Sequence, residues 1–257
     1  MMFFDSHIHT EFSTDSQMKA QDALKQAERL GLGLVFTEHF DAGLMTEKGE
    51  MAFSAEDYWK MYEPLRGDCL RLGVELGLTL DAKEQNLAFM GRAPFDFVIG
   101  SIHLLDGADI YYPDVYEGRK KREYYHAYFA AMEQNLRLHG YIHVLGHIDY
   151  IARYATFEDP EPRYDEFHEE IDAVLRAAIE TDTVMELNTR RLGKKSAQEA
   201  LLDIYKRYHE LGGRFVTIGS DAHRVEAVGA HYAVARDMAE ACGLRIAAFQ
   251  QGKMELA

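Results

Sequence analysis

The stretch "FFDSHIH", residues 3–9, begins like a buried β-strand and ends on two histidines. Side chains alternate along a strand, so His7 and His9 share one side while Ile8 faces the other. Two imidazoles about 7 Å apart along one strand can hold a single metal ion. They can equally form a hydrogen-bonded surface pair, so the rest of the chain has to distinguish the two interpretations.

The composition limits the possible partners. The 257 residues include 28 Lys and Arg against 43 Asp and Glu, which gives a net charge of −15. An acidic surface repels nucleic-acid backbones, so we expect no general role in DNA or RNA binding. A small anionic substrate would need a local positive centre made by metals or arginines. The oligomeric state stays open.

Cysteine content and the absence of targeting patterns indicate the compartment. The two cysteines, Cys69 and Cys242, lie far apart in no metal-binding spacing, so we expect no disulfide framework. The N-terminus does not resemble a signal peptide, and no apolar run approaches the roughly 18 residues of a membrane span. We therefore expect a cytoplasmic protein with no membrane partner.

Strand-like apolar segments alternate with amphipathic helical patterns along the whole chain. The seven expected strands are 3–9, 33–38, 73–80, 95–103, 143–147, 183–188 and 214–220. The expected helices are 18–30, 55–72, 119–139, 164–181, 197–211 and 227–241. This order predicts one α/β domain, residues 1–257, with a mostly parallel sheet, and it fits both a barrel and an open doubly wound sheet. Two less regular segments, 40–54 and 104–118, follow strand ends, where α/β folds place binding loops.

Metal-binding residue types gather near the C-terminal ends of these strands. In a parallel α/β fold all such ends face one side of the molecule. Nine side chains should therefore converge: His7, His9, Asp15, His39, Glu75, His103, His147, Asp221 and His223. Imidazoles and carboxylates without thiolates suit a catalytic site for Zn, Mn or Fe. Nine groups exceed what one ion uses, so we expect two or three divalent transition-metal ions, with Glu75 as a natural bridge.

The alternative is that each histidine is separately a buried core or helix-end residue. That interpretation fits His143, which begins the fifth expected strand, at the end opposite the predicted site. It fits poorly for six histidines and three carboxylates at the ends of six strands. The metal interpretation is therefore favoured.

Two arginines follow strand ends on the same side of the predicted fold. The guanidinium groups of Arg153 and Arg190 could bind phosphate oxygens in a two-pronged geometry that lysine does not reproduce. Alternatively, Arg153 caps a helix and Arg190 pairs with a surface carboxylate. Arg191 is expected to point elsewhere.

The motifs occur in a fixed order: HxH at 7–9, Asp15, "TEH" at 37–39, "GVE" at 73–75, "GSIH" at 100–103, "GHID" at 146–149 and "SDAH" at 220–223. In this order the chain resembles the polymerase and histidinol phosphatase (PHP) superfamily along nearly its whole length. The resemblance implies a distorted seven-stranded (β/α)7 barrel, TIM-like, with a trinuclear metal centre at the C-terminal ends of the strands. It implies three ligand sets: His7, His9, Glu75 and Asp221; then Glu75, His103 and His147; then Asp15, His39 and His223.

Within the superfamily, "GHIDYIARY" (146–154), "ELNTR" (186–190) and "GSDAH" (219–223) are similar to the histidinol-phosphate phosphatase branch. This likeness implies hydrolysis of L-histidinol phosphate in histidine biosynthesis, by attack of a metal-bridging hydroxide. The implied catalytic residues are Glu75, Asp221 and His223, and the implied phosphate-binding residues are Arg153 and Arg190.

Two other functions stay open at this point. One is a related phosphatase or phosphodiesterase for nucleotides or sugar phosphates, and the other is a non-catalytic metal-binding module of a polymerase assembly. The chain carries no insertion of domain size and no polymerase portion, which favours the small phosphate ester. Glu11 and Asp41, near the expected mouth of the site, are candidates to meet a substrate ammonium group.

Overall fold

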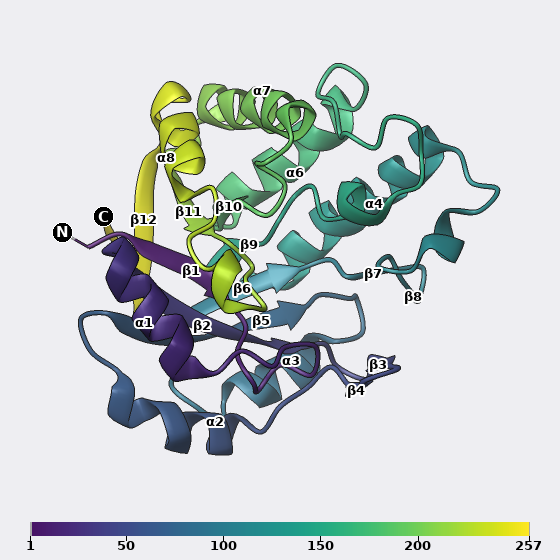
Figure 1. Cartoon of the computed structure of the whole chain (residues 1–257). Coiled ribbons are helices and arrows are strands. Elements are labelled where there is room, and N and C mark those ends of the chain that lie inside the picture. The colour runs from purple at the N-terminus through teal and green to yellow at the C-terminus, as the bar shows by residue number, and fades with distance from the viewer. Residues whose placement is uncertain (1, 257) are drawn as a thin grey trace.

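A nine-stranded sheet forms the centre of the computed structural model, which describes residues 2–256 (Figure 1). The strands, in their order across the sheet, are β1 (Phe4–Ile8), β2 (Gly33–Phe40), β5 (Leu70–Gly77), β6 (Phe97–Ser101), β9 (Val144–Leu145), β10 (Val184–Asn188), β11 (Phe215–Gly219), β12 (Arg245–Gln250) and β13 (Lys253–Leu256). Neighbours pair in parallel except β12 and β13, which are antiparallel. Because the other strands are parallel, their C-terminal ends share one side of the molecule.

Helices connect the strands and lie outside them (Figure 1). They are α1 (Ala20–Leu30), α2 (Ala55–Tyr62), α3 (Lys83–Met90), α4 (Lys121–Leu138), α5 (Ile151–Tyr154), α6 (His168–Glu180), α7 (Lys195–Leu211) and α8 (Tyr232–Ala241), with short 3-10 turns η1 (Glu63–Leu65), η2 (Pro113–Tyr116) and η3 (Val225–Ala227). None of these described helices combines the length and the apolar character needed to cross a membrane.

Helix α1 shows how the sequence pattern produces this packing. It buries Ala20, Ala23 and Ala27, which the spacing of three and four residues places on one face. It ends at Gly31, whose φ of 68° lies in the left-handed region that glycine adopts without steric cost.

The end of β1 also meets the segment that follows β11. Ile8 and Ala222 form an isolated parallel bridge, and the backbone N–H of Asp221 donates to the His7 carbonyl at 2.8 Å. The N–H of His9 donates to the Ala222 carbonyl at 2.9 Å. The first and seventh predicted strands therefore bring the HxH and "SDAH" motifs side by side.

Two short hairpins extend from the C-terminal side of the sheet (Figure 1). The strands β3 (Met45–Thr46) and β4 (Gly49–Glu50) follow β2, and β7 (Leu104–Leu105) and β8 (Ala108–Asp109) follow β6. They lie within the segments 40–54 and 104–118, which the sequence marked as irregular.

The predicted α/β class with a mostly parallel sheet is confirmed, and all seven predicted strands are present. The count of seven was too low, because β12 and β13 add two strands near the C-terminus. The helix predicted at 55–72 is wrong beyond Tyr62. Pro64 lies in the η1 turn, where it cannot continue the helical hydrogen bonds, and β5 already begins at Leu70. Helices α3 and α5 were not predicted.

Candidate metal centre

The nine predicted residues lie together at the C-terminal ends of the strands. Five groups of three have ligand atoms within 4.8 Å of one another: His7–His9–Glu75, Glu75–His103–His147, His7–His147–Asp221, His9–His39–His223 and His39–Asp41–His103. Asp15 lies at the edge, with its carboxylate 3.0 Å from His223 Nε2 and 3.7 Å from His39 Nε2. The structure thus places His9, as well as Asp15, beside His39 and His223.

Glu75 lies at the centre of this cluster, on the buried strand β5. Its two oxygens face five imidazoles, those of His7, His9, His39, His103 and His147. Burial alone would raise the pKa of Glu75, but the nearby His7 and His39 outweigh that effect and hold the pKa well below its usual value. An anionic carboxylate placed between two groups of imidazoles can contribute an oxygen to the ligand set of each group.

Several buried atoms of the cluster have no hydrogen-bond partner among the described residues. They include His7 Nε2, His9 Nε2 and Glu75 Oε2. Buried polar atoms are nearly always paired, because an unpaired one costs about 1–3 kcal/mol. A divalent cation among these three atoms would satisfy all of them, and a nitrogen and oxygen donor set suits Zn, Mn or Fe. The residues present therefore fit a metal ion.

The histidines of the cluster differ in protonation: nearby carboxylates outweigh burial and raise the pKa of His7, His39 and His103, whereas the pKa of His9 is lowered. Burial lowers the pKa of His9, and the neighbouring His39 and His223 lower it further, well below its usual value. The folded protein therefore favours the neutral imidazole, which is the form that binds a metal.

Carboxylates behind the histidines orient their rings. Glu186 Oε1 lies 2.7 Å from His7 Nδ1, and Asp41 Oδ1 lies 2.7 Å from His103 Nδ1. Each of these bonds leaves Nε2 facing Glu75. Such partners behind metal-binding histidines fix the tautomer and the ring orientation.

A longer relay orients His9. Its Nδ1 lies 3.0 Å from Ser13 Oγ, which donates to Glu38 Oε2 at 2.6 Å. Glu38 is fully buried and also accepts the backbone N–H of Thr10 at 2.9 Å. Sequence reasoning missed Glu186, Glu38 and Ser13, although Glu38 lies within "TEH" and Glu186 within "ELNTR".

Three glycines near strand ends make room for these outer partners. A Cβ atom on Gly77 would overlap Asp41 Oδ1, and one on Gly219 would overlap Glu186 Oε1. A Cβ on Gly146 would overlap Ser101 Oγ, which donates to Glu75 Oε1 at 2.6 Å. We name Gly77, Gly146 and Gly219 the spacer glycines. The partner side chains leave no room for a Cβ atom at these three positions.

Asp221 links the histidines to the two predicted arginines. Its φ of 54° lies in the left-handed region, which Asp tolerates better than most residues, and the chain turns there directly after β11. Arg153 Nη1 donates to Asp221 Oδ2 at 2.6 Å, and Arg190 Nη1 donates to the Asp221 carbonyl at 2.6 Å. Arg190 Nη1 also lies 3.2 Å from His223 Nδ1.

Arg191 points away from the cluster, as expected. Its guanidinium is buried and donates to Asp149 at 2.7 Å and to Glu161 at 2.8 Å. Arg190, the adjacent residue, has a side chain that is 38% exposed and faces the pocket. The two adjacent arginines therefore differ in role: Arg191 forms buried ion pairs, and Arg190 lines the pocket.

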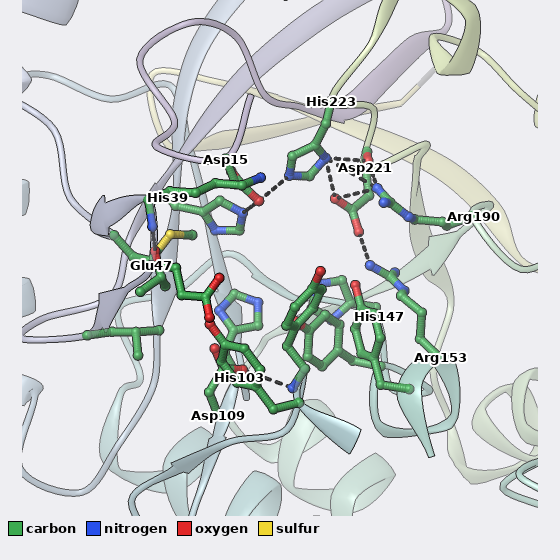
Figure 2. Close-up of a pocket in the computed structure, with 18 residues that line it drawn as sticks. Asp15, His39, Glu47, His103, Asp109, His147, Arg153, Arg190, Asp221 and His223 are labelled. Carbon is green, nitrogen blue, oxygen red and sulfur yellow. Dashed lines mark hydrogen bonds and ion pairs between the residues drawn. The ribbon is translucent and has the colours of Figure 1, made fainter. Parts of the chain in front are cut away.

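A pocket of about 280 Å³ opens over the cluster (Figure 2). Its lining comprises Asp15, His39, Leu44, Thr46, Glu47, Lys48, Met51, His103, Asp109, Tyr111, Tyr112, His147, Tyr150, Arg153, Tyr154, Arg190, Asp221 and His223. Neither carboxylate proposed from the sequence for a substrate ammonium is part of it. Glu11 pairs with Lys19 at 2.7 Å, and Asp41 is buried against His103.

A parallel α/β fold that collects imidazoles, carboxylates and two arginines in one pocket is typical of metal-dependent hydrolases of phosphate esters. The chain belongs to the PHP domain family, whose sequence model matches residues 5–190. The predicted superfamily is therefore confirmed.

Known relatives match most or all of the chain. It is 45% identical over 256 residues, 100% of both chains, to a protein of Clostridium acetobutylicum named probable histidinol-phosphatase. It is 28% identical to the histidinol-phosphatase of Lactococcus lactis subsp. lactis, over 87% of this chain and 85% of the relative. A solved structure of histidinol phosphate phosphatase from Lactococcus lactis subsp. lactis, complexed with zinc, L-histidinol and phosphate, matches with a TM-score of 0.91, 27% identity and 98% coverage of both chains.

Proposed function

We propose that this protein is a metal-dependent phosphomonoesterase that hydrolyses L-histidinol phosphate to L-histidinol and phosphate. The observation that carries the proposal is the pocket with two arginines in its wall, which opens over a cluster of buried imidazole and carboxylate atoms that have no hydrogen-bond partner within residues 2–256. The relatives named histidinol-phosphatase, and the solved neighbour with zinc, L-histidinol and phosphate, support the choice of substrate. The reaction would serve histidine biosynthesis.

We assign two or three divalent ions, Zn, Mn or Fe, to the cluster. The assigned ligand sets are His7, His9, Glu75 and Asp221; Glu75, His103 and His147; and Asp15, His39 and His223. Bound ions of this kind supply positive charge to phosphoryl oxygens and lower the pKa of water so that it can attack phosphorus. Glu75 would contribute to two of these ligand sets, because one of its oxygens faces His7 and the other faces His147.

Arg153 and Arg190 would bind the phosphate. Both guanidinium groups are anchored on Asp221 and both line the pocket. Anchored donors need little reorganisation when negative charge grows on the equatorial oxygens in the transition state. Glu75, Asp221 and His223 would complete the catalytic set, with His223 lying between Asp15 and Arg190 at the edge of the pocket.

We also propose that residues 1–257 act as one catalytic domain. Strand β13 pairs with β12, which continues the sheet beside β11. Arg71 of β5 donates to Glu255 of β13 at 2.7 Å. The two free cysteines, Cys69 and Cys242, are consistent with action in the cytoplasm.

Steady-state kinetics of the purified protein test the proposal. L-histidinol phosphate should give a higher kcat/KM than a nucleoside monophosphate or an aryl phosphate. Elemental analysis should find more than one equivalent of transition metal, and a chelator should abolish turnover. Preferential hydrolysis of the nucleotide, or full activity in metal-free protein, would contradict the proposal.

A further inference from the structure

The two arginines proposed to bind phosphate lie on different segments of the chain. Arg153 belongs to α5, which follows β9, and Arg190 comes two residues after β10. Figure 2 shows both side chains on the same side of the pocket, where both reach Asp221. We infer that the buried ion pair of Asp149 with Arg191 ties these two segments together and fixes the spacing of the two phosphate-binding arginines. This inference rests on the proposed function, because it concerns the phosphate-binding groups of that site.

Each member of the Asp149–Arg191 pair is directly connected to one of the two segments. Arg191 Nη1 donates to Asp149 Oδ2 at 2.7 Å, and both side chains are 4% exposed. Arg191 follows Arg190 directly in the chain. The Asp149 carbonyl accepts the backbone N–H of Ala152 at 3.0 Å, at the turn from which α5 starts. The pair therefore joins the residue beside Arg190 to the start of the helix that carries the other arginine.

The helix that carries Arg153 has little stability of its own. Helix α5 spans only Ile151–Tyr154, and a single helical turn fixes several backbone dihedral angles for few hydrogen bonds. Contacts from outside the helix must therefore hold it in place. The ion pair of Asp149 supplies one such contact at the start of α5. Asp221, which accepts from Arg153 at 2.6 Å, supplies another at the side chain.

The segment that carries Arg190 is held on both sides of that residue. Before it, the buried Asn188 accepts the backbone N–H of Arg190 on Oδ1 at 3.1 Å, and Arg153 Nη2 lies 3.4 Å from the same oxygen. After it, Arg191 is anchored on Asp149. The side chain of Arg190 is 38% exposed, so the direction in which it points depends on a fixed backbone.

The charges of the pair suit a positioning role better than a stabilising one. Arg191 also donates to Glu161 at 2.8 Å, so one buried cation faces two buried carboxylates. Buried ion pairs seldom add net stability compared with apolar side chains of similar volume, because each charge loses its hydration. A hydrogen bond between a planar guanidinium and a carboxylate is directional, however, and apolar packing is not. Neither Asp149 nor Arg191 is among the described residues that line the pocket, so the pair acts through its neighbours.

Two matched variants of the same buried cluster test the inference. Asp149→Ala cuts the tie to α5, whereas Glu161→Ala removes the other, similarly buried carboxylate of Arg191 and leaves the tie in place. Each variant leaves one cation facing one carboxylate. Asp149→Ala should lower kcat/KM for L-histidinol phosphate by roughly ten- to hundredfold, because a displacement of about 1 Å in a positioning contact can cost that much. Glu161→Ala should keep nearly the wild-type value.

Three further measurements separate a positioning role from a general loss of structure. Calorimetric titration of the metal-loaded protein with inorganic phosphate should show weaker binding in Asp149→Ala, at a metal content that elemental analysis finds unchanged. A partly unfolded sample would lower the apparent kcat and leave KM as it is, whereas misplaced arginines should also raise KM. In the Arg190→Met background, Asp149→Ala should cost much less than in the wild type, because one arginine alone has no spacing to fix.

A conservative variant provides the rescue. Asp149→Asn keeps the shape of the side chain, and its neutral amide oxygen can still accept from Arg191, so it should restore most of the activity lost in Asp149→Ala. If Asp149→Ala does not fold, Asp149→Asn and Glu161→Gln make the same comparison, with a smaller loss expected in the first and none in the second. Equal kcat/KM in these two would then overturn the inference.

Four outcomes of the main comparison would also overturn it. They are wild-type kinetics in Asp149→Ala, equal losses in Asp149→Ala and Glu161→Ala, loss of metal together with activity, and full additivity with Arg190→Met. A wild-type protein that hydrolyses an aryl phosphate but not L-histidinol phosphate would instead contradict the proposed function. The same variants would then be compared on the aryl ester and by phosphate titration, which test the positioning pair whichever ester is the substrate.

Discussion

His143 and His147 lie at the two ends of β9, four residues apart, and their surroundings have little in common. At the N-terminal end, His143 Nδ1 accepts the Val98 N–H at 3.0 Å, and its ring stacks on Phe249 with centroids 5.1 Å apart. At the C-terminal end, His147 Nε2 lies 3.0 Å from Glu75 Oε1, among other histidines. The His143 ring is packed in the core with its Nδ1 hydrogen-bonded, whereas the His147 ring faces the cluster of histidines around Glu75.

The electrostatics of the two ends differ in the same way. Burial lowers the pKa of His143 to about 4, and within residues 2–256 no carboxylate opposes that effect. Burial also lowers the pKa of His147, but Glu75 acts against that effect. The difference teaches that the end of the strand decides the role of a histidine in this fold, since residue type and strand are the same. The predictions below test this contrast.

The largest loss is expected at the centre of the C-terminal side. Glu75→Ala and His7→Ala should each lose bound metal and nearly all turnover, well beyond the roughly 10–100-fold cost of an outer partner. Elemental analysis together with kinetics would check this. A Glu75→Ala protein that retained both metal and turnover would remove Glu75 from the centre of the site.

The next-largest loss of activity is expected for the two arginines in the pocket. Arg153→Met and Arg190→Met should each lower kcat/KM by an amount equivalent to roughly 2–4 kcal/mol of transition-state stabilisation, which is the scale of losing one preorganised donor. The loss should be larger for Arg153, because its nearly buried guanidinium lies 2.6 Å from the Asp221 carboxylate, whereas the more exposed Arg190 lies 3.7 Å from it. Metal content should stay unchanged, and Lys at either position should rescue only part of the loss, since it lacks the planar fork. Near-wild-type efficiency in both variants would exclude these residues from phosphate binding.

The outer partners should have a smaller effect. Asp41→Asn should weaken metal binding or activity roughly 10–100-fold, because it removes the charge that orients His103. Gly77→Ala should act in the same direction by displacing the Asp41 carboxylate. Metal titration of both variants would check this. Gly43→Ala is not a suitable control, because Gly43 has a φ of 76°, whereas Gly67→Ala meets no atom within 4 Å and should leave metal affinity unchanged.

Substitution of His143, at the N-terminal end of β9, should not change activity. His143→Gln should retain metal and turnover at neutral pH but alter the response of stability to acid. Because the folded-state pKa of about 4 lies below the usual 6.5, the wild-type free energy of unfolding is highest above pH 6.5 and falls toward pH 4, by roughly 2–3 kcal/mol from this group. Urea unfolding at pH 7 and pH 4.5 measures this fall in the free energy of unfolding. The contribution of His143 to the fall should be missing in His143→Gln. It should be present in His168→Gln, the control, which changes an exposed histidine.

The comparison also explains how much could be predicted from the sequence. A histidine at a C-terminal strand end is recognisable because parallel strands bring those ends together, whatever their separation in the chain. The convergence of His7, His103 and His147 follows from that rule. The same rule indicated that His143 was structural.

The outer partners do not follow from strand order. Asp41 was expected at the pocket mouth, but its backbone N–H donates to the Met51 carbonyl at 2.7 Å, across the β3–β4 hairpin, and its side chain turns inward to His103. No local pattern predicts a pairing ten residues along the chain. The carboxylates of Glu47 and Asp109 depend on the same hairpins, whose strands have only two residues each. Short strands carry too little periodicity to be read from a sequence.

The spacer glycines have a consequence for finding such sites in other chains. Gly77, Gly146 and Gly219 contribute no functional group, yet each faces a partner that holds the cluster in place. A search that scores only histidines and carboxylates would accept a chain in which these glycines have become alanines. Such a chain would keep every donor and lose the volume in which the donors are arranged. Glycine at these three strand ends is therefore as informative as the histidines for distinguishing a functional metal centre from one that has lost its function.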